Sequence, residues 1–312
     1  MSTREDGDLY TGLALAQVPR ILGLADRREG ARTYGCFDRY YWQYRLMDFP
    51  NARFQEGVHL LALLYHHSLD GNPFAGQRMI AGLARGAVDF WAGIRNRDGS
   101  VSEVYPNERS LCATAFSFAA VTEALLRWGW PLPRNWERTA RWLARAPDSP
   151  ASNQNAAAAV ALYNCYLLTG DTGLEAEAVA EVGRLVRAQH PQGYYPEYGG
   201  ADVGYHSLTL SWLVRYQQKA KDHALLESLR KAVAFVEERV GPDGRHDSSA
   251  NSRRTQFLYP YGLVAHGSGV VARHLVGLRQ GQVLQPGWLD DRYVIPLSVD
   301  FLEAGLEMQR HG

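Results

Sequence analysis

The chain contains 312 residues, and 33 lysines and arginines balance 33 aspartates and glutamates. A formal net charge of zero argues against a general nucleic-acid-binding protein, which carries a basic surplus. Hydrophobic residues make up 46% and charged residues 21%, a composition that excludes intrinsic disorder and is typical of a globular protein. We expect one domain spanning residues 1–312, because a chain of this length can bury a large core.

The cysteines and the N-terminus indicate the cellular setting. Cys36, Cys112 and Cys165 stand far apart, so neither a disulfide framework nor a zinc motif is expected. The first ten residues are charged and lack an apolar signal core, and no window of uncharged apolar residues is long enough to predict a membrane span. We therefore expect a cytoplasmic protein without metal or other cofactor, and without a nucleic-acid or membrane partner. The oligomeric state stays open.

Apolar residues recur at spacings of three and four along most of the chain, which predicts amphipathic helices. The predicted helices span residues 54–67, 77–95, 110–128, 134–146, 155–168, 173–189, 205–219, 222–240 and 257–278. Alternating strand patterns are scarce, so we expect an all-α protein of about eleven helices. Ser110, Asn153 and Asp222 are expected to cap helix N-termini.

The helices alternate in character. Residues 110–126 and 155–168 are almost entirely small or apolar, as in buried helices, whereas 173–189 and 222–240 carry one charged face. Long loops rich in Gly, Pro, Asn and aromatic residues precede the apolar helices at a spacing of about 45–50 residues, the length of a two-helix repeat. Five or six such hairpins predict a complete or incomplete (α/α) toroid, whose loops gather at one end and line a cleft. An open helical solenoid is the alternative.

These loops carry the candidate functional residues. We expect catalytic roles for four of them, namely His206, Tyr205, Tyr259 and Arg253. We expect substrate-binding roles for Arg39, Trp42, Glu56, Tyr105, Asn107, Asn155, Glu197, Asp202 and Arg254. A histidine that follows a tyrosine at a helix start, with two carboxylates upstream and adjacent arginines in the next loop, indicates a site for an anion, because arginines in a cavity need an anionic partner.

The stretch QGYYPEYGGADVGYHSLTLSWL (192–213), followed by SRRTQFLYPYG (252–262), resembles the toroid domain of heparinase II/III-like proteins and related polysaccharide lyases. In those enzymes a segment with Tyr and His and a downstream segment with Arg and Tyr face a uronate-binding cleft. The resemblance implies a lyase or C5-epimerase that removes the proton beside a carboxylate. Those lyases usually append a large β-sandwich domain and carry a secretion signal, and we expect neither from this sequence. We therefore expect a small or oligomeric anionic carbohydrate-like substrate.

Two other enzyme classes remain open, besides a non-catalytic scaffold that binds a partner. A glycoside hydrolase would use two carboxylates, and Glu56, Glu103, Glu197 and Asp202 could supply them. A terpenoid-cyclase-like toroid would line its cavity with aromatic rings that stabilise carbocations. The position of His206 distinguishes a lyase or epimerase from a glycoside hydrolase. A pocket shared with Tyr259, Arg253 and Arg254 favours proton abstraction, and a side chain directed into the helix packing favours the hydrolase.

Overall fold

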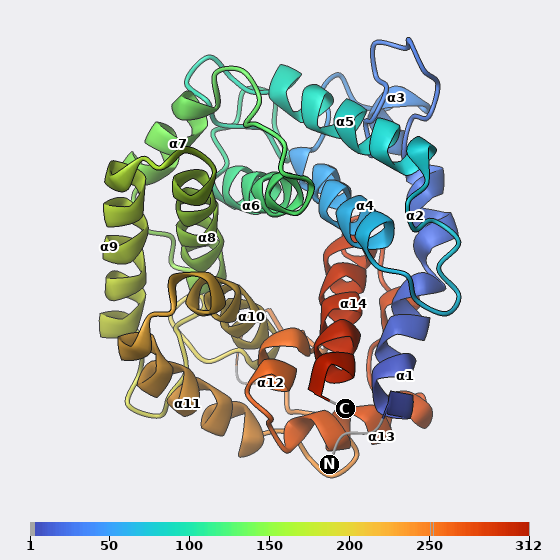
Figure 1. Ribbon diagram of the computed structural model, residues 1–312. Helices are drawn as coiled ribbons and strands as arrows, with labels where there is room; N and C mark the ends of the chain where they lie inside the picture. Colours follow the sequence, from blue (N-terminus) through green and yellow to red (C-terminus); the bar gives the residue numbers. More distant parts are fainter. Residues whose placement is uncertain (1–3, 250, 252, 312) are drawn as a thin grey trace.

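The computed structural model describes residues 4–249, 251 and 253–311. Within this part of the chain it contains helices and no β-strand, so the prediction of an all-α protein is confirmed (Figure 1). The few β-bridges are isolated pairs in the loops, such as the one between Val101 and Ser110.

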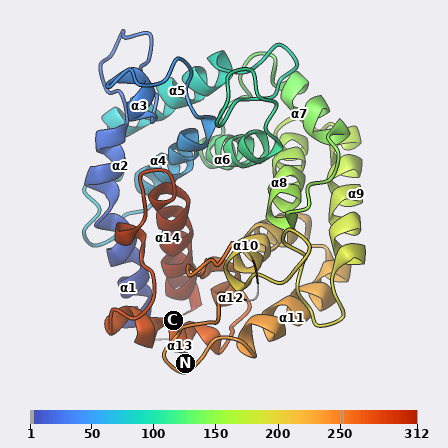
Figure 2. The same ribbon diagram turned by 180° about the vertical axis from the view of Figure 1, so that it is seen from behind.

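The helices form an inner and an outer group, as Figures 1 and 2 show. The inner group surrounds the centre and comprises α4 (Gly57–His66), α6 (Leu111–Trp128), α8 (Ser152–Thr169), α10 (Val203–Ala220), α12 (Tyr261–Ala265) and α14 (Val294–His311). Outside it lie α1 (Arg4–Leu15), α2 (Val18–Leu24), α5 (Arg78–Gly93), α7 (Trp136–Arg145), α9 (Thr172–Ala188), α11 (His223–Glu237) and α13 (Val270–Arg279). The loops contain α3 (Arg39–Trp42) and two 3-10 helices, η1 (Ala52–Glu56) and η2 (Pro286–Trp288).

Burial explains which helices are inner and which are outer. In α8 the whole run of residues 156–162 is buried, because small side chains let α6, α9 and α10 pack closely on several sides. In α9 burial follows one stripe, through Leu174, Ala178, Val182 and Leu185, and the opposite face is exposed. The expected alternation of apolar and two-faced helices is therefore present at these two elements.

Two local expectations are wrong. The predicted helix over 257–278 is two helices, α12 and α13, because the chain turns at Gly267, which has φ +63°. Asn153 does not cap α8, because it is the second residue of that helix and its side chain contacts Glu197. Ser110 and Asp222 do cap α6 and α11, accepting hydrogen bonds from backbone N–H groups of the first turn.

The loops that lead into the inner helices are joined to one another by hydrogen bonds. These bonds connect Ala52 to Ser102, Pro150 to Tyr198, Glu197 to Asn251, and Glu103 to Arg292. Each bond joins loops that are far apart in sequence but precede inner helices. The segments before α4, α6 and α14 are thus joined to one another, as are those before α8, α10 and α12, and the candidate site lies beside the first set.

The first and last helices pack against each other. Helix α1 lies along α14, and Gly305 allows the close approach, because a Cβ atom there would stand 2.7 Å from the carbonyl oxygen of Gly7. The ring of Tyr10 meets that of Phe301 edge-on, with centroids 5.2 Å apart. The first and last described helices therefore lie side by side, as Figure 1 shows.

Of the described helices, α6 is long and apolar enough to cross a membrane by length and composition. Most of this helix is buried inside the protein, and core helices of globular proteins pass the same test.

Candidate active site

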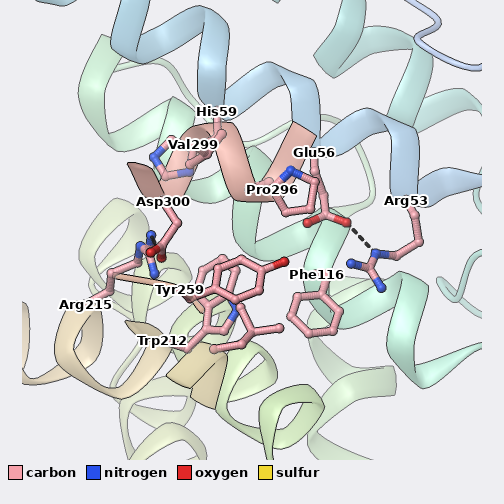
Figure 3. Close-up of a pocket in the computed structure, with 12 residues that line it drawn as sticks. Arg53, Glu56, His59, Phe116, Trp212, Arg215, Tyr259, Pro296, Val299 and Asp300 are labelled. Carbon is pink, nitrogen blue, oxygen red and sulfur yellow. Dashed lines mark hydrogen bonds and ion pairs between the residues drawn. The ribbon is translucent and has the colours of Figure 1, made fainter. Parts of the chain in front are cut away.

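A small cavity lies between η1, α4, α6, α10 and α14, and Figure 3 shows its lining. Its walls combine charged and aromatic side chains, namely Arg53, Glu56, His59, Phe116, Trp212, Arg215, Tyr259 and Asp300, with Ala120, Leu208, Pro296 and Val299. The free volume is about 20 Å³, which holds about one water molecule. The cavity is therefore too small for a sugar ring.

The ion pair between Arg53 and Glu56 forms one wall of the cavity. Both residues belong to η1, which places their side chains on the same side, and both are buried. The guanidinium group of Arg53 lies 4.2 Å from the ring centroid of Phe116 and donates to Sγ of Cys112 at 3.0 Å. Burial raises the pKa of Glu56, and the positive charge of Arg53 opposes this effect.

Tyr259 supplies a hydroxyl group to the same cavity. Figure 3 shows its phenol oxygen directed toward the side that carries Glu56 and Phe116. Burial and the nearby Glu56 carboxylate raise its pKa well above the usual range. Tyr259 is therefore neutral near pH 7 and can donate a proton or a hydrogen bond, but it is a poor base.

A second carboxylate lies next to this wall. Oε1 of Glu103 accepts a hydrogen bond from Nη1 of Arg292 at 2.8 Å, and Oε2 accepts one from Ser110 at 3.1 Å. Both Glu103 and Arg292 are close enough to Glu56 to influence its pKa. The site thus holds two carboxyl groups, each paired with an arginine.

An open groove of about 500 Å³ runs beside the cavity on the outer side of η1. Four carboxylates line it beside Arg292, Asn51 and Phe54, namely Asp38, Glu103, Asp290 and Asp291. The remaining lining side chains are unusually exposed, namely Tyr40, Leu46, Met47 and Val104. Phe54 comes between Arg53 and Glu56 in η1, so the groove and the cavity share this short helix. The groove is large enough for a sugar-sized ligand.

Buried charges continue from the cavity between the inner helices. Arg215 donates to Glu303 at 2.9 Å and to Asp300 at 3.1 Å. Glu303 also accepts from Arg127 at 2.6 Å and lies 3.4 Å from Nε2 of His59. These contacts join α4, α6, α10 and α14, so this part of the site also holds the inner helices together.

His206 does not face the cavity, and its assignment as a catalytic base is corrected. The ring is fully buried between α10 and α11, where Nδ1 accepts from the backbone N–H of Tyr195 at 3.1 Å. Nε2 is 3.0 Å from the carbonyl oxygen of Ala232, to which it donates. Burial lowers the pKa of His206 to about 4. The side chain points into the helix packing, where neither nitrogen is free to accept a substrate proton.

The other three residues with expected catalytic roles are separated. Tyr259 lines the cavity, as described above. Tyr205 is half-buried, meets the ring of Phe257 edge-on and interacts with the Tyr293 hydroxyl group. Arg253 is exposed, and its guanidinium group lies over the ring of Tyr198 at 4.0 Å. Only Tyr259 contacts the enclosed part of the site.

Three expected substrate-binding residues hold loops in place instead. Glu197 is fully buried and accepts from Asn153 and Thr209, which ties its loop to α8 and α10. Asp202 caps α10 by accepting from the backbone of Tyr205 at 2.8 Å. Asn155 bonds both the N–H and the carbonyl of Ser149. Their polar atoms are occupied by the protein itself, so these assignments are corrected.

The remaining expected binding residues lie at the surface. Trp42 donates to the carbonyl of Leu24 at 2.7 Å, which anchors α3 on α2, and Arg39 lies over the ring of Tyr44. Tyr105, Asn107 and Arg254 are exposed loop residues. Of all expected binding residues, Glu56 alone lines the cavity.

Several site residues lie outside the predicted sets. Arg215 and Asp300 stand within apolar helical stretches, SWLVRY and SVDFL, and such isolated charges are the sequence signal that could have identified them. Arg53 lies in η1 with the predicted Glu56. From the sequence, Glu103 is expected only as a carboxylate of the hydrolase alternative. Within the residues that the structure describes, no group of three His, Cys, Asp or Glu side chains is arranged to hold a metal ion.

Comparison of the chain with models of known protein families gives no match, and comparison with curated protein sequences gives none either. The resemblance to heparinase II/III-like proteins therefore depends on the residues quoted above.

Proposed function

We propose that this chain is an enzyme that acts on a small anionic carbohydrate by acid–base catalysis, with Glu56 as the proton donor. The observation that carries the proposal is a carboxyl group buried in the wall of a cavity, with a raised pKa and an arginine partner. A carboxyl group whose pKa is raised stays protonated closer to neutral pH and can protonate a leaving oxygen.

Hydrolysis of a glycosidic bond is the reaction that fits best. It needs a second carboxylate, which activates water or attacks the sugar directly, and Glu103 is the residue next to Glu56 that supplies one. The cavity has room for one water molecule beside Glu56. Tyr259 can stabilise the developing charge by hydrogen bonding.

Elimination or epimerisation fits less well. Both need a base that removes a carbon-bound proton. His206 is enclosed, Nε2 of the cavity residue His59 accepts from Arg127 and lies near Glu303, and Tyr259 has a raised pKa. A cyclase of terpenoid type also fits less well, because the cavity walls carry buried ion pairs and little free volume. Arg292, which lines the open groove, supports an anionic group in the substrate.

The proposal includes the (α/α) toroid architecture and the relation to heparinase II/III-like proteins. Six helices around the centre, a second group outside them and the hydrogen bonds between loops that precede inner helices support this architecture (Figure 2). Exposed tyrosines in these loops, such as Tyr40 and Tyr105, offer flat faces on which sugar rings can stack.

The test is an assay of the purified protein on a panel of neutral and uronate-containing oligosaccharides. New reducing ends are expected with at least one member, without the absorbance near 230–235 nm that an unsaturated product would give. Glu56→Gln is expected to reduce the rate by about 10²–10⁴-fold, because the amide cannot donate the proton.

Glu227→Gln is the matched control, because Glu227 is exposed on α11 and pairs only with surface cations. Full activity of that variant, together with a folded Glu56→Gln protein by circular dichroism, assigns the loss to the site. An unsaturated product would replace hydrolysis by elimination. Unchanged activity of Glu56→Gln would remove Glu56 from the mechanism.

A further inference from the structure

A groove lined by four arginines lies on the outer side of the molecule, separate from the candidate active site. Arg138, Arg141 and Arg145 project from α7, and Arg97 comes from the loop after α5. Trp142 forms an aromatic wall, and the groove has a volume of about 570 Å³. It is large enough for a nucleotide-sized ligand.

The groove has a fixed shape, because the loop and the helix are packed tightly together. Gly99 has φ +99°, and a Cβ atom there would lie 2.4 Å from the carbonyl carbon of Arg138. Thr139 donates to the carbonyl of Gly99 at 2.8 Å, and Arg95 donates to the carbonyl of Asn135 at 2.8 Å. A preformed site loses little conformational entropy on binding.

The positive charge in the groove is not neutralised by the protein. Among the described residues, none of the four arginines forms an ion pair. Asp98 also lines the groove, but its carboxylate pairs with Arg109 at 3.0 Å and accepts from Ser100. The negative end of the α7 dipole stabilises the positive charge of Arg145, which stands in the last turn of that helix. It does not account for the other three arginines.

We propose that this groove binds a linked di- or triphosphate group. Along α7, Arg138 and Arg145 are about 10 Å apart, so their side chains can contact successive phosphates. Guanidinium groups bind phosphate oxygens in a bidentate manner, which makes arginine well suited to such a chain of charges. Trp142 offers a ring on which a nucleoside base can stack. Free oligophosphate and a nucleoside triphosphate are the two sources of this chemistry.

Isothermal titration of the full-length protein with inorganic tripolyphosphate and, separately, with ATP tests the proposal. Saturable binding of at least one is expected, and the double variant Arg141→Gln/Arg145→Gln is expected to weaken it at least tenfold. If ATP binds more tightly than tripolyphosphate, and if this preference is lost in the double variant Trp142→Phe/Arg141→Gln, the ligand is a nucleotide. Equal or weaker binding of ATP identifies the phosphate chain alone.

Arg230→Gln is the matched control, because Arg230 is an exposed arginine on another outer helix. This variant should bind both probes as tightly as the unaltered protein does. The replaced arginines are exposed, so the variants should fold, and a melting curve verifies this. Absence of binding to both probes, or binding that the double variant and the control retain equally, would overturn the proposal. Neither result depends on Glu56, so the proposed carbohydrate activity is tested separately.

Discussion

At the scale of single residues, a buried neutral histidine makes the stability of this protein sensitive to acid. His206 is enclosed on all sides and bonded through both ring nitrogens. Burial lowers its pKa from 6.5 to about 4 in the folded state. The unfolded chain takes up a proton near pH 6.5, whereas the folded protein resists protonation down to about pH 4.

The unfolded state therefore binds more protons between these two pH values, and the free energy of unfolding falls as the pH is lowered through them. His206 alone is expected to account for a loss of about 3 kcal/mol between pH 7 and pH 4. Urea denaturation at both pH values measures it. His206→Gln should show a smaller loss, and His223→Gln, at an exposed position, should show the full loss. Equal pH dependence of all three proteins would contradict this account.

Residue types in the loops singled out Glu56 and Tyr259, which line the cavity, but they misplaced His206, whose side chain is enclosed between helices. Successive residues of an α-helix point about 100° apart, so Tyr205 and His206 face different neighbours. Tyr205 lies beside Phe257, in the loop before α12, while His206 points toward α11. Which of the two faces the site depends on the rotation of α10 against α11, and one sequence does not contain that information.

At the scale of helices, the contact between α1 and α14 depends on small residues. A Cβ atom on Gly305 would stand 2.4 Å from Cγ2 of Thr11 and 2.7 Å from the backbone oxygen of Gly7. Gly12, in the same pair of helices, faces open space with no atom within 4 Å of a Cβ.

Gly305→Ala is expected to destabilise the protein by about 1–3 kcal/mol, because the two helices must move apart. Gly12→Ala should have the opposite sign and stabilise by up to about 1 kcal/mol, because alanine favours the helix. Thermal or urea denaturation of both variants compares them directly. A change of the same sign in both would show that close packing does not govern this contact.

Helical periodicity predicted most elements, because the buried stripe of each outer helix and the apolar run of each inner helix are local patterns. It joined α12 and α13, because Gly267, Ser268 and Gly269 form a short turn that leaves the apolar pattern almost unbroken. The pairing of α1 with α14 has no local signal, since its determinants, Gly7 and Gly305, stand at opposite ends of the chain. The single-domain organisation stays a prediction.

At the scale of the whole molecule, buried ion pairs connect helices from both halves of the chain. Arg215 on α10 bonds both Asp300 and Glu303 on α14, and Glu303 also contacts Arg127 on α6. Removing one partner of a buried charge cluster leaves the others desolvated and unpaired, which is far more costly than losing a surface pair.

Arg215→Met is therefore expected to lower the free energy of unfolding by about 3–5 kcal/mol. Arg230→Met removes an exposed arginine that pairs with Glu227, and it should change stability by less than about 1 kcal/mol. Chemical denaturation near pH 7 measures both. A loss from Arg215→Met no larger than that from the surface control would mean that the network contributes little to the assembly of the inner helices.

The contact between α1 and α14 has a consequence for biosynthesis. Helix α1 is synthesised well before α14, the helix against which it packs. At about 5–20 residues per second, the apolar face of α1 waits on the order of 15–60 s for its partner. During that interval the nascent chain exposes an unmatched apolar surface on α1, to which chaperones that bind apolar helices have access.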